Sequence, residues 1–180
     1  IYSGESGGLN EATSDIFAAC VEHHTANPAQ PGNYLLGEKI FKVNIPNAAL
    51  RNMADPRSDG VSIDHYSLYR AGMDVHYSSG IANSFFYLLA EGAVVPAGFG
   101  AGTWANLSPS SLVCNGNTSL VGIGRTAAGK IWYRALTVYM TSSTNYAGAR
   151  AATLSAAMDL YGAGSQYNAV AAAWSAVGVN

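Results

Sequence analysis

Charged residues are scarce in this chain, which has 9 Lys and Arg and 11 Asp and Glu among its 180 residues. A charged share of 11% is low for a soluble domain. We therefore expect a surface made of Ser, Asn, Thr, Gly and Tyr. The net charge of -2 supplies no basic patch. The sequence thus excludes binding to nucleic acid or to an anionic membrane surface that is driven by charge.

Cysteine and long apolar runs are also scarce. Two cysteines, Cys20 and Cys114, exclude a disulfide-rich scaffold but leave open whether they pair or stay free. Cys20 lies on the apolar side of a predicted helix, so we favour a buried free thiol there. The most apolar stretch, Val94 to Val113, is interrupted by two prolines and an asparagine, so no membrane span is predicted. The chain begins at Ile1, without Met or a signal peptide, which suggests a processed or truncated product.

Apolar residues are abundant enough, at 49%, for one buried core. Their spacing predicts five helices, at residues 7–24, 76–91, 120–140, 145–161 and 165–177. Three glycines are placed to end helices and one asparagine to begin one: Gly92, Gly162, Gly178 and Asn145.

Between the helices we expect a short strand at 38–45, one helical turn at 48–53 and a long surface loop between Glu91 and Arg125. That loop contains Asn106 and Asn117 in the glycosylation acceptor pattern. The predicted fold is a single mainly α domain over residues 1–180, a helical bundle of about five helices with long loops.

Two pairs of residues could carry chemistry. Glu11 and Asp15 are four apart, so their carboxylates share one helix face, which suits metal binding or acid–base work. On spacing alone, a solvated helix edge is the favoured interpretation. Asp74 and His76 are two apart, so the carboxylate could orient the imidazole; a histidine that merely packs at a helix start is equally compatible.

Other motifs are weaker or missing. His23 and His24 are adjacent and point about 100° apart on a helix, so we interpret them as surface residues. The chain contains no HExxH, no CxxC pair and no phosphate-binding glycine loop.

Several ordered motifs nevertheless resemble one family. Residues 1–15, Ile-Tyr-Ser-Gly-Glu-Ser-Gly-Gly-Leu-Asn-Glu-Ala-Thr-Ser-Asp, resemble the stretch that follows the HExxH helix in thermolysin-like zinc metallopeptidases of the thermolysin, griselysin and pseudolysin type. The same order continues in Leu-Arg-Asn-Met-Ala-Asp-Pro at 50–56, Asp-His-Tyr-Ser at 64–67 and Asp-Val-His-Tyr-Ser-Ser-Gly-Ile-Ala-Asn at 74–83. The resemblance covers nearly the whole chain and is weakest at 94–120.

The resemblance implies a role for each matching residue. Glu11 corresponds to the third zinc ligand and Asp15 to the acid that holds a zinc histidine. His76 and Tyr2 correspond to donors to the tetrahedral intermediate, and Asp74 to the acid that orients the histidine. Further matches concern the substrate: Arg51 would bind its carbonyl, and Leu36, Ile40 and Leu50 would form the wall of the pocket for a bulky apolar residue.

Calcium is implied as a second metal. Glu22 and Glu38 correspond to calcium ligands, with the Leu35 carbonyl as a third candidate. Asn33 stands near the place of an expected carboxylate, so we expect one weakened site. Lys42 and Ala48 do not suit a further calcium site.

The implied activity is that of a secreted zinc-dependent metalloendopeptidase that cleaves before bulky hydrophobic residues. Because the HExxH half of the site is absent, we expect the isolated chain to be inactive. The alternative is a stand-alone, non-catalytic binding domain that docks a partner or a proteinaceous inhibitor through its apolar half-cleft. Implied partners are a peptide or protein substrate and the missing N-terminal domain, with no nucleic acid or membrane.

Overall fold

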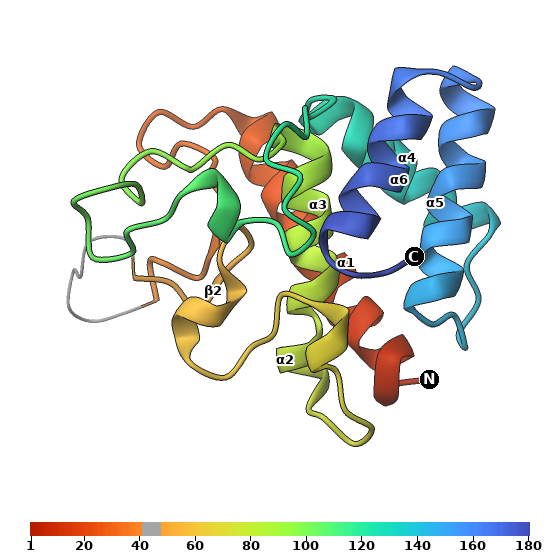
Figure 1. The fold of residues 1–180 in the computed structure, drawn as a ribbon, viewed down its shortest axis with the longest axis horizontal. Coiled ribbons are helices and arrows are strands. Elements are labelled where there is room, and N and C mark those ends of the chain that lie inside the picture. Colours follow the sequence, from red (N-terminus) through yellow and green to blue (C-terminus); the bar gives the residue numbers. More distant parts are fainter. Residues whose placement is uncertain (41–47) are drawn as a thin grey trace.

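The computed structural model describes residues 1–40 and 48–180 and is mainly α-helical (Figure 1). In chain order its elements are α1 (Gly4–Thr25), β1 (Leu35–Leu36), β2 (Arg51–Asn52), η1 (Pro56–Asp59), η2 (Tyr66–Leu68), α2 (Val75–Ser78), α3 (Gly80–Glu91), η3 (Pro109–Ser111), α4 (Arg125–Val138), α5 (Tyr146–Tyr161) and α6 (Ser165–Ala176). The η elements are short 3-10 helices. The predicted helical bundle with long loops is confirmed.

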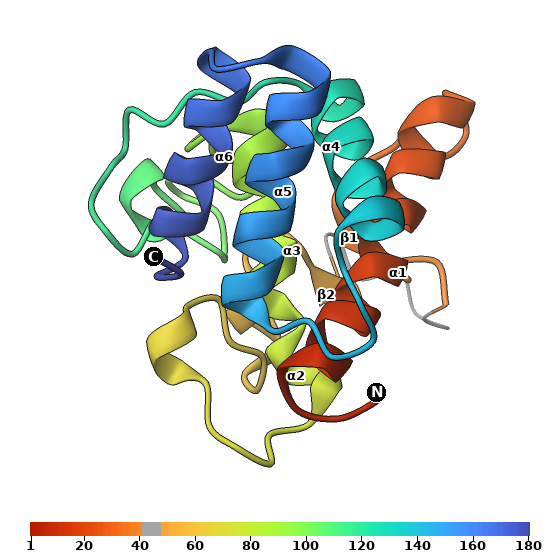
Figure 2. The ribbon, with the colours of Figure 1, turned by 90° about the vertical axis from the view of Figure 1, so that its right-hand side faces the viewer.

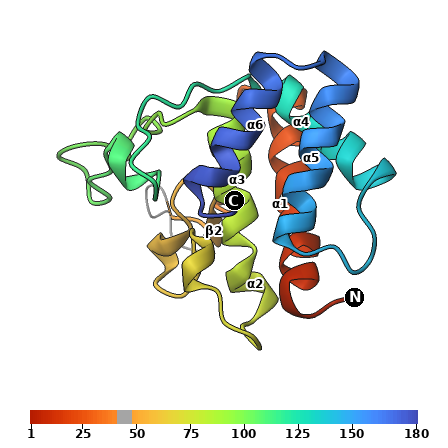
Figure 3. The same cartoon turned by 45° about the vertical axis from the view of Figure 1, so that its right-hand side comes forward.

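Helix α3 is the centre of the bundle. It contacts α1, α4 and α6, and every residue from Gly80 to Ala90 is buried. A helix that is apolar on all sides is one that other helices surround. Helices α4, α5 and α6 lie side by side in chain order (Figure 2), and α1 passes close to α3 and α5 (Figure 3).

Aromatic and small side chains fill the space between the helices. Phe85 of α3 stacks on Trp174 of α6 with 3.8 Å between ring centroids. The Trp174 indole N–H donates to Thr153 Oγ1 on α5 at 2.8 Å, so the buried polar groups of this contact are paired. Alanines on α5 and α6, among them Ala149, Ala156 and Ala173, are fully buried and allow a close helix approach.

The predicted helix ends agree with local chemistry. The Asn145 side chain accepts from the Gly148 N–H at 2.8 Å, which confirms it as the N-cap of α5. Gly92 and Gly162 end α3 and α5 with φ of 81° and 73°, which favours glycine. Gly178, with φ of 78°, follows the end of α6 at Ala176.

One predicted element is wrong, and one predicted helix begins later than expected. The expected turn at 48–53 is instead strand β2, which pairs antiparallel with β1. The predicted helix 120–140 begins only at Arg125, because residues 120–124 run along the end of α3: Ala93 N–H donates to the Leu120 carbonyl at 3.0 Å, and Ile123 N–H to the Leu89 carbonyl at 2.9 Å. Long-range backbone bonds thus replace helical ones.

Smaller differences concern the remaining expectations. The helix predicted at 76–91 is divided at Ser79 into α2 and α3. Cys20 and Cys114 are both free, and Cys20 is half-buried. Most of the strand expected at 38–45, and Lys42 with it, lies outside the described residues. Within the described ranges, no helix combines the length and the apolar character that a membrane crossing requires.

Candidate active site

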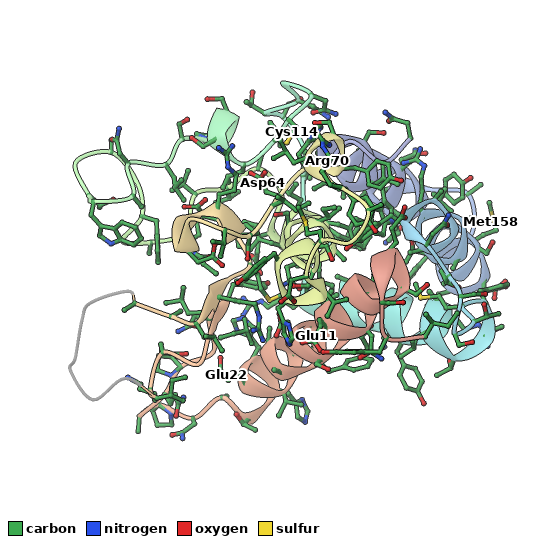
Figure 4. All side chains as sticks on the ribbon, turned by 90° about the horizontal axis from the view of Figure 1, so that it is seen from below. Glu11, Glu22, Asp64, Arg70, Cys114 and Met158 are labelled. Carbon is green, nitrogen blue, oxygen red and sulfur yellow. The ribbon has the colours of Figure 1, made fainter. Side chains whose placement is uncertain are left out.

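Tyr2, Glu11 and His76 converge from three parts of the chain. Tyr2 precedes α1, Glu11 lies on α1, and His76 lies on α2. The Tyr2 hydroxyl donates to Glu11 Oε1 and lies 3.4 Å from His76 Nε2. His76 Nε2 is 3.7 Å from Glu11 Oε2. Figure 4 shows Glu11 near the middle of the lower face, whereas Glu22 lies toward the far end of the same helix.

Asp74 fixes the direction of the His76 ring. Its Oδ1 accepts from the His76 backbone N–H at 2.9 Å and lies 2.7 Å from ring Nδ1. These two bonds hold the pKa of the Asp74 carboxyl below its usual value, the backbone bond having the larger effect. Because Nδ1 is occupied by Asp74, Nε2 faces Glu11 and Tyr2. Asp74 thus contacts the His76 ring, as the spacing of the two residues allows.

Tyr2 is held in its neutral, donating form. Its pKa is raised above the usual value, mainly by the hydrogen bond to Glu11 and further by the loss of hydration and the charge of Glu11. A phenol that stays protonated remains a hydrogen-bond donor. With half of the His76 side chain exposed, the cluster combines a phenol, an imidazole and a carboxylate on an accessible surface.

Asp15 is buried, with 3% of its surface exposed, so the interpretation as a solvated helix edge is wrong for Asp15. Arg51 binds both of its oxygens, with Nε–Oδ2 and Nη2–Oδ1 distances of 2.7 Å. This bidentate bond raises the Arg51 pKa. Arg51 is thus an ion-pair partner of Asp15, a contact that the sequence did not predict.

Asn83 is a further partner of Asp15, and the sequence analysis did not identify this contact. Its Nδ2 donates to Asp15 Oδ2 at 2.8 Å from the buried face of α3, and 1% of the residue is exposed. A polar side chain inside an otherwise apolar helix is the signal that could have identified it, because buried polar groups need partners.

An apolar patch adjoins Arg51. Strand pairing sets Leu36 opposite Arg51, and the Leu50 N–H donates to the Leu36 carbonyl at 2.8 Å. Ile40 and Leu50 are 66% and 50% exposed, and atoms of both lie within 3.4 Å of the point where a Cβ on Gly37 would stand. The three apolar residues predicted from the sequence therefore lie together, beside the arginine.

The predicted calcium residues also lie together, at the C-terminal end of α1. Loss of hydration raises the pKa of Glu22 most, and the nearby charge of Glu38 adds to this, whereas a bond from the Asn33 backbone N–H acts in the opposite direction. The Asn33 side chain donates to Glu38 Oε1 at 3.3 Å. Two nearby carboxylates are chemistry that suits calcium.

The predicted zinc residue fits as a single ligand. Glu11 is a carboxylate with 18% of its side chain exposed and with oxygens facing His76 and Tyr2. Within residues 1–40 and 48–180, no three His, Cys, Asp or Glu side chains form a group that could hold a metal ion. One carboxylate alone does not bind zinc tightly, since protein zinc sites use three or four ligands.

His23 and His24 differ from each other. His24 is exposed, as predicted, but His23 is half-buried, with its ring 5.1 Å from that of Tyr34. The prediction of two surface histidines is therefore wrong for His23.

Comparisons with known proteins identify the family of this chain. Residues 1–179 match the family described as "Thermolysin metallopeptidase, alpha-helical domain". The chain is 50% identical over 179 residues to the transglutaminase-activating metalloprotease of Streptomyces mobaraensis, covering 99% of this chain and 22% of that protein. It is 40% identical over 185 residues to thermolysin from Alicyclobacillus acidocaldarius, covering 99% of this chain and 29% of that protein.

A solved structure of another metalloproteinase is also similar to this chain. The precursor of protealysin, a metalloproteinase from Serratia proteamaculans, aligns with a TM-score of 0.70 and 26% identity over 100% of this chain and 52% of that chain. The chain spans about a quarter of the length of the curated relatives named above. The match over residues 1–179, together with these identities, shows that the chain belongs to the thermolysin metallopeptidase family, as its alpha-helical domain.

Proposed function

We propose that this chain supplies the helical wall of the active-site cleft of a secreted, zinc-dependent metalloendopeptidase that cleaves peptide bonds before bulky hydrophobic residues. The observation that carries the proposal is the contact of Tyr2, Glu11 and His76, three side chains from separate elements, beside an exposed apolar patch. Family membership supports the same interpretation.

In this proposal Glu11 holds the zinc ion together with ligands from outside the chain, and Asp15 accepts a bond from one of those histidines. Asp15 Oδ1 accepts one bond from Arg51, so it retains a lone pair for another donor. Bound zinc would supply Lewis-acid polarisation of the peptide carbonyl and of water.

His76 and Tyr2 act on the developing oxyanion. The His76 Nε2 and the Tyr2 hydroxyl lie 3.4 Å apart, so both can reach one substrate oxygen that lies at hydrogen-bond distance from each; the protonated imidazole then donates from Nε2, and the Tyr2 hydroxyl donates once it turns from Glu11 to that oxygen. Asp74 stabilises the protonated imidazole through Nδ1. Hydrogen-bond donors at this position stabilise charge that develops in the transition state.

Arg51 and the apolar patch would position the substrate. Nε and Nη2 of the Arg51 guanidinium donate to Asp15, so Nη1 remains to donate to a substrate carbonyl. Leu36, Ile40 and Leu50 would contact a Leu or Phe side chain after the cleaved bond, because burial of an apolar side chain favours binding. The substrate is a peptide or protein, as the name of the Streptomyces mobaraensis relative indicates for that enzyme.

The test compares His76→Ala with His24→Ala in the full-length protein, on a peptide with Leu after the cleaved bond. Loss of one oxyanion donor lowers kcat by about 10² to 10³-fold, so we expect this for His76→Ala. His24 is exposed on the same chain and lies outside the cluster, so His24→Ala should keep the kcat of the unmodified protein. An unchanged kcat for His76→Ala would remove His76 from the mechanism.

The zinc content and peptidase activity of the isolated chain test whether the other zinc ligands come from outside it. We expect it to bind no stoichiometric zinc and to cleave no peptide, because Glu11 is one ligand of at least three. Zinc measured at one ion per purified chain would contradict this. If the full-length protein with zinc binds a protein inhibitor but cleaves no peptide, the alternative of a non-catalytic docking domain replaces the proposal.

A further inference from the structure

Glu5 is an acidic residue of α1 that the proposed mechanism does not use. It lies in the first turn of this helix, between Tyr2 and Glu11 in the chain. The Tyr66 hydroxyl donates to its Oε1 at 2.9 Å, and the Tyr146 backbone N–H donates to its Oε2 at 2.8 Å. Glu5 therefore joins the start of α1 to two segments that lie 61 and 141 residues further along the chain.

Tyr146, the first residue of α5, extends this connection to the helix that carries His76. The start of α5 lies beside that of α1 (Figure 3), and Tyr146 is fully buried there. Its side-chain hydroxyl donates at 2.6 Å to the carbonyl of Ser78, which lies two residues after His76 in α2. One buried residue thus bonds to α1 through its backbone and to α2 through its side chain.

Tyr66 holds the other oxygen of Glu5 from the short helix η2. Its backbone N–H donates at 2.9 Å to the carbonyl of Val177, which ties it to the segment after α6. Its ring meets that of Tyr146 edge to face, with 5.9 Å between centroids. Because the two donors to Glu5 also contact each other, the carboxylate has one favourable position, as is typical of a fully bonded polar network.

A purely local role for Glu5 is the alternative. The first turn of a helix has N–H groups without helical partners and a partial positive charge, so a carboxylate at the start of α5 stabilises that helix by itself. Asn145 acts in this way at the same helix start, since its side chain accepts from the Gly148 N–H at 2.8 Å. Experiments on Glu5 therefore have to separate the stability of α5 from the placement of α1 against α2.

We infer that Glu5 is a positioning residue of the proposed peptidase: it fixes the start of α1, with Tyr2, against α2, with His76. The inference rests on the proposed function, in which the side chains of Tyr2 and His76 act on one substrate oxygen. Their hydroxyl and Nε2 lie 3.4 Å apart, on the two segments that Glu5 and Tyr146 connect. A displacement of about 1 Å can cost about 10²-fold in rate, so bonds that prevent it contribute to catalysis without contact with the substrate.

Two substitutions that preserve the length of the side chain test the bonds of Glu5. Glu5→Met removes both acceptors, so the buried Tyr146 N–H loses its partner. On a peptide with Leu after the cleaved bond, kcat of the full-length protein should fall about tenfold. KM should change by less than about twofold, because Arg51 and the apolar patch lie at the β1 and β2 strand pair. Glu5→Gln keeps an acceptor oxygen, and the Tyr66 hydroxyl can accept from its amide, so most of kcat should remain.

Asn145→Ala is the matched control for the stability of α5. It removes the other side-chain bond at the start of this helix, but it breaks no bond between α5 and α1. Its kcat should equal that of the unmodified protein. A purely local role for Glu5 predicts instead that Asn145→Ala and Glu5→Met lower kcat to the same extent.

The NMR signal of the His76 ring protons gives a readout that does not depend on peptidase activity. The His76 and Tyr2 rings lie edge to face with 6.4 Å between centroids, so the ring current of Tyr2 makes this signal sensitive to their relative position. The signal is assigned by its loss in His76→Ala. It should move in Glu5→Met and stay in place in Glu5→Gln and Asn145→Ala. The signal of the exposed His24 should stay in place in all three variants.

The inference is overturned if Glu5→Met keeps either the kcat or the His76 signal of the unmodified protein. It is also overturned if Asn145→Ala or Glu5→Gln loses as much kcat as Glu5→Met. Should Glu5→Met fail to fold, Tyr66→Phe decides, because it removes one of the two bonds and keeps the ring: kcat should fall about two- to fourfold and the His76 signal should move, and no change in either overturns the inference. If the unmodified full-length protein cleaves no peptide, the proposed function fails, and the His76 signal alone decides whether Glu5 sets the position of His76.

Discussion

At the scale of single residues, Asp15 is the charge that the fold must compensate. Its side chain is 4% exposed, and Arg51 and Asn83 supply its described hydrogen bonds. Removing one partner of a buried ion pair leaves an uncompensated charge, which is costly, whereas removing both charges is tolerated far better.

Arg51→Ala should therefore lower the free energy of unfolding by about 3 kcal/mol. In the double variant Arg51→Ala, Asp15→Asn, much of this loss should be recovered, because no buried charge remains. Urea unfolding of the full-length protein measures both changes. If the double variant is as unstable as Arg51→Ala, the bidentate pair is not the cause of the loss.

Cys114 gives a second prediction at this scale. Burial of the thiol and the charge of Asp64 raise its pKa to about 11, although the residue as a whole is exposed, because the thiol lines a cavity beside Asp64. At pH 8 its alkylation should be about tenfold slower than that of the same cysteine in the urea-unfolded chain, since fewer thiolates outweigh their higher nucleophilicity. Iodoacetamide labelling followed by peptide mass spectrometry measures the two rates, and equal rates would contradict the raised pKa.

At the scale of elements, the contact between α1 and α2 sets the distance between Glu11 and His76. Gly8 lies where these helices meet, and a Cβ there would stand 2.6 Å from Ser78 Oγ and from the Tyr146 hydroxyl. The same Tyr146 hydroxyl donates to the Ser78 carbonyl at 2.6 Å. The backbone N–H of Tyr146 donates to the Glu5 carboxylate at 2.8 Å. Small residues at this crossing thus hold the cluster together.

Gly8→Ala should destabilise the protein by about 1–3 kcal/mol, because the added methyl group forces α1 and α2 apart. It should also lower kcat of the full-length protein about tenfold or more, since small displacements of catalytic groups are costly. Gly129→Ala is the control: it lies inside α4, where the nearest atom is Cys20 Sγ at 3.2 Å. If both variants lose activity equally, the effect does not arise at the α1 and α2 contact.

At the scale of the whole molecule, the C-terminal end of α1 meets the residues on both sides of β1, at Glu22, Asn33 and Glu38. Two carboxylates facing each other repel, so an ion between them would bind the folded state better than the unfolded one. Such binding raises stability by mass action.

Calcium should therefore stabilise the full-length protein. At about 100 times its dissociation constant the gain is about 2.7 kcal/mol, which is about 5–10 °C in Tm for a domain of this size. Calorimetry with and without calcium chloride, at fixed zinc, measures the shift. Glu22→Gln and Glu38→Gln should lose it, whereas the exposed Asp159→Asn on α5 should keep it; a shift that survives in Glu22→Gln would place calcium elsewhere.

The local part of this fold could be predicted from the sequence. Apolar spacing identified α1, α3, α5 and α6, and the glycines at 92 and 162 identified two helix ends, because these features depend on neighbours within about four residues. The contact of Asp74 with His76 was predictable for the same reason, since two residues separate them. The roles of Glu11, Tyr2 and Arg51 came from the ordered family motifs and stay predictions.

Contacts between distant residues decided the rest. The strand pairing of Leu36 with Arg51, the late start of α4 at Arg125, the burial of Asp15 against Asn83 and the contact of His23 with Arg125 all join segments far apart in the chain. The sequence by itself determined which segments are helical and which residues have the chemistry of a site, because both are local properties. Only the tertiary structure decided which of those side chains meet and which lose water, since packing sets burial and burial sets the cost of each charge.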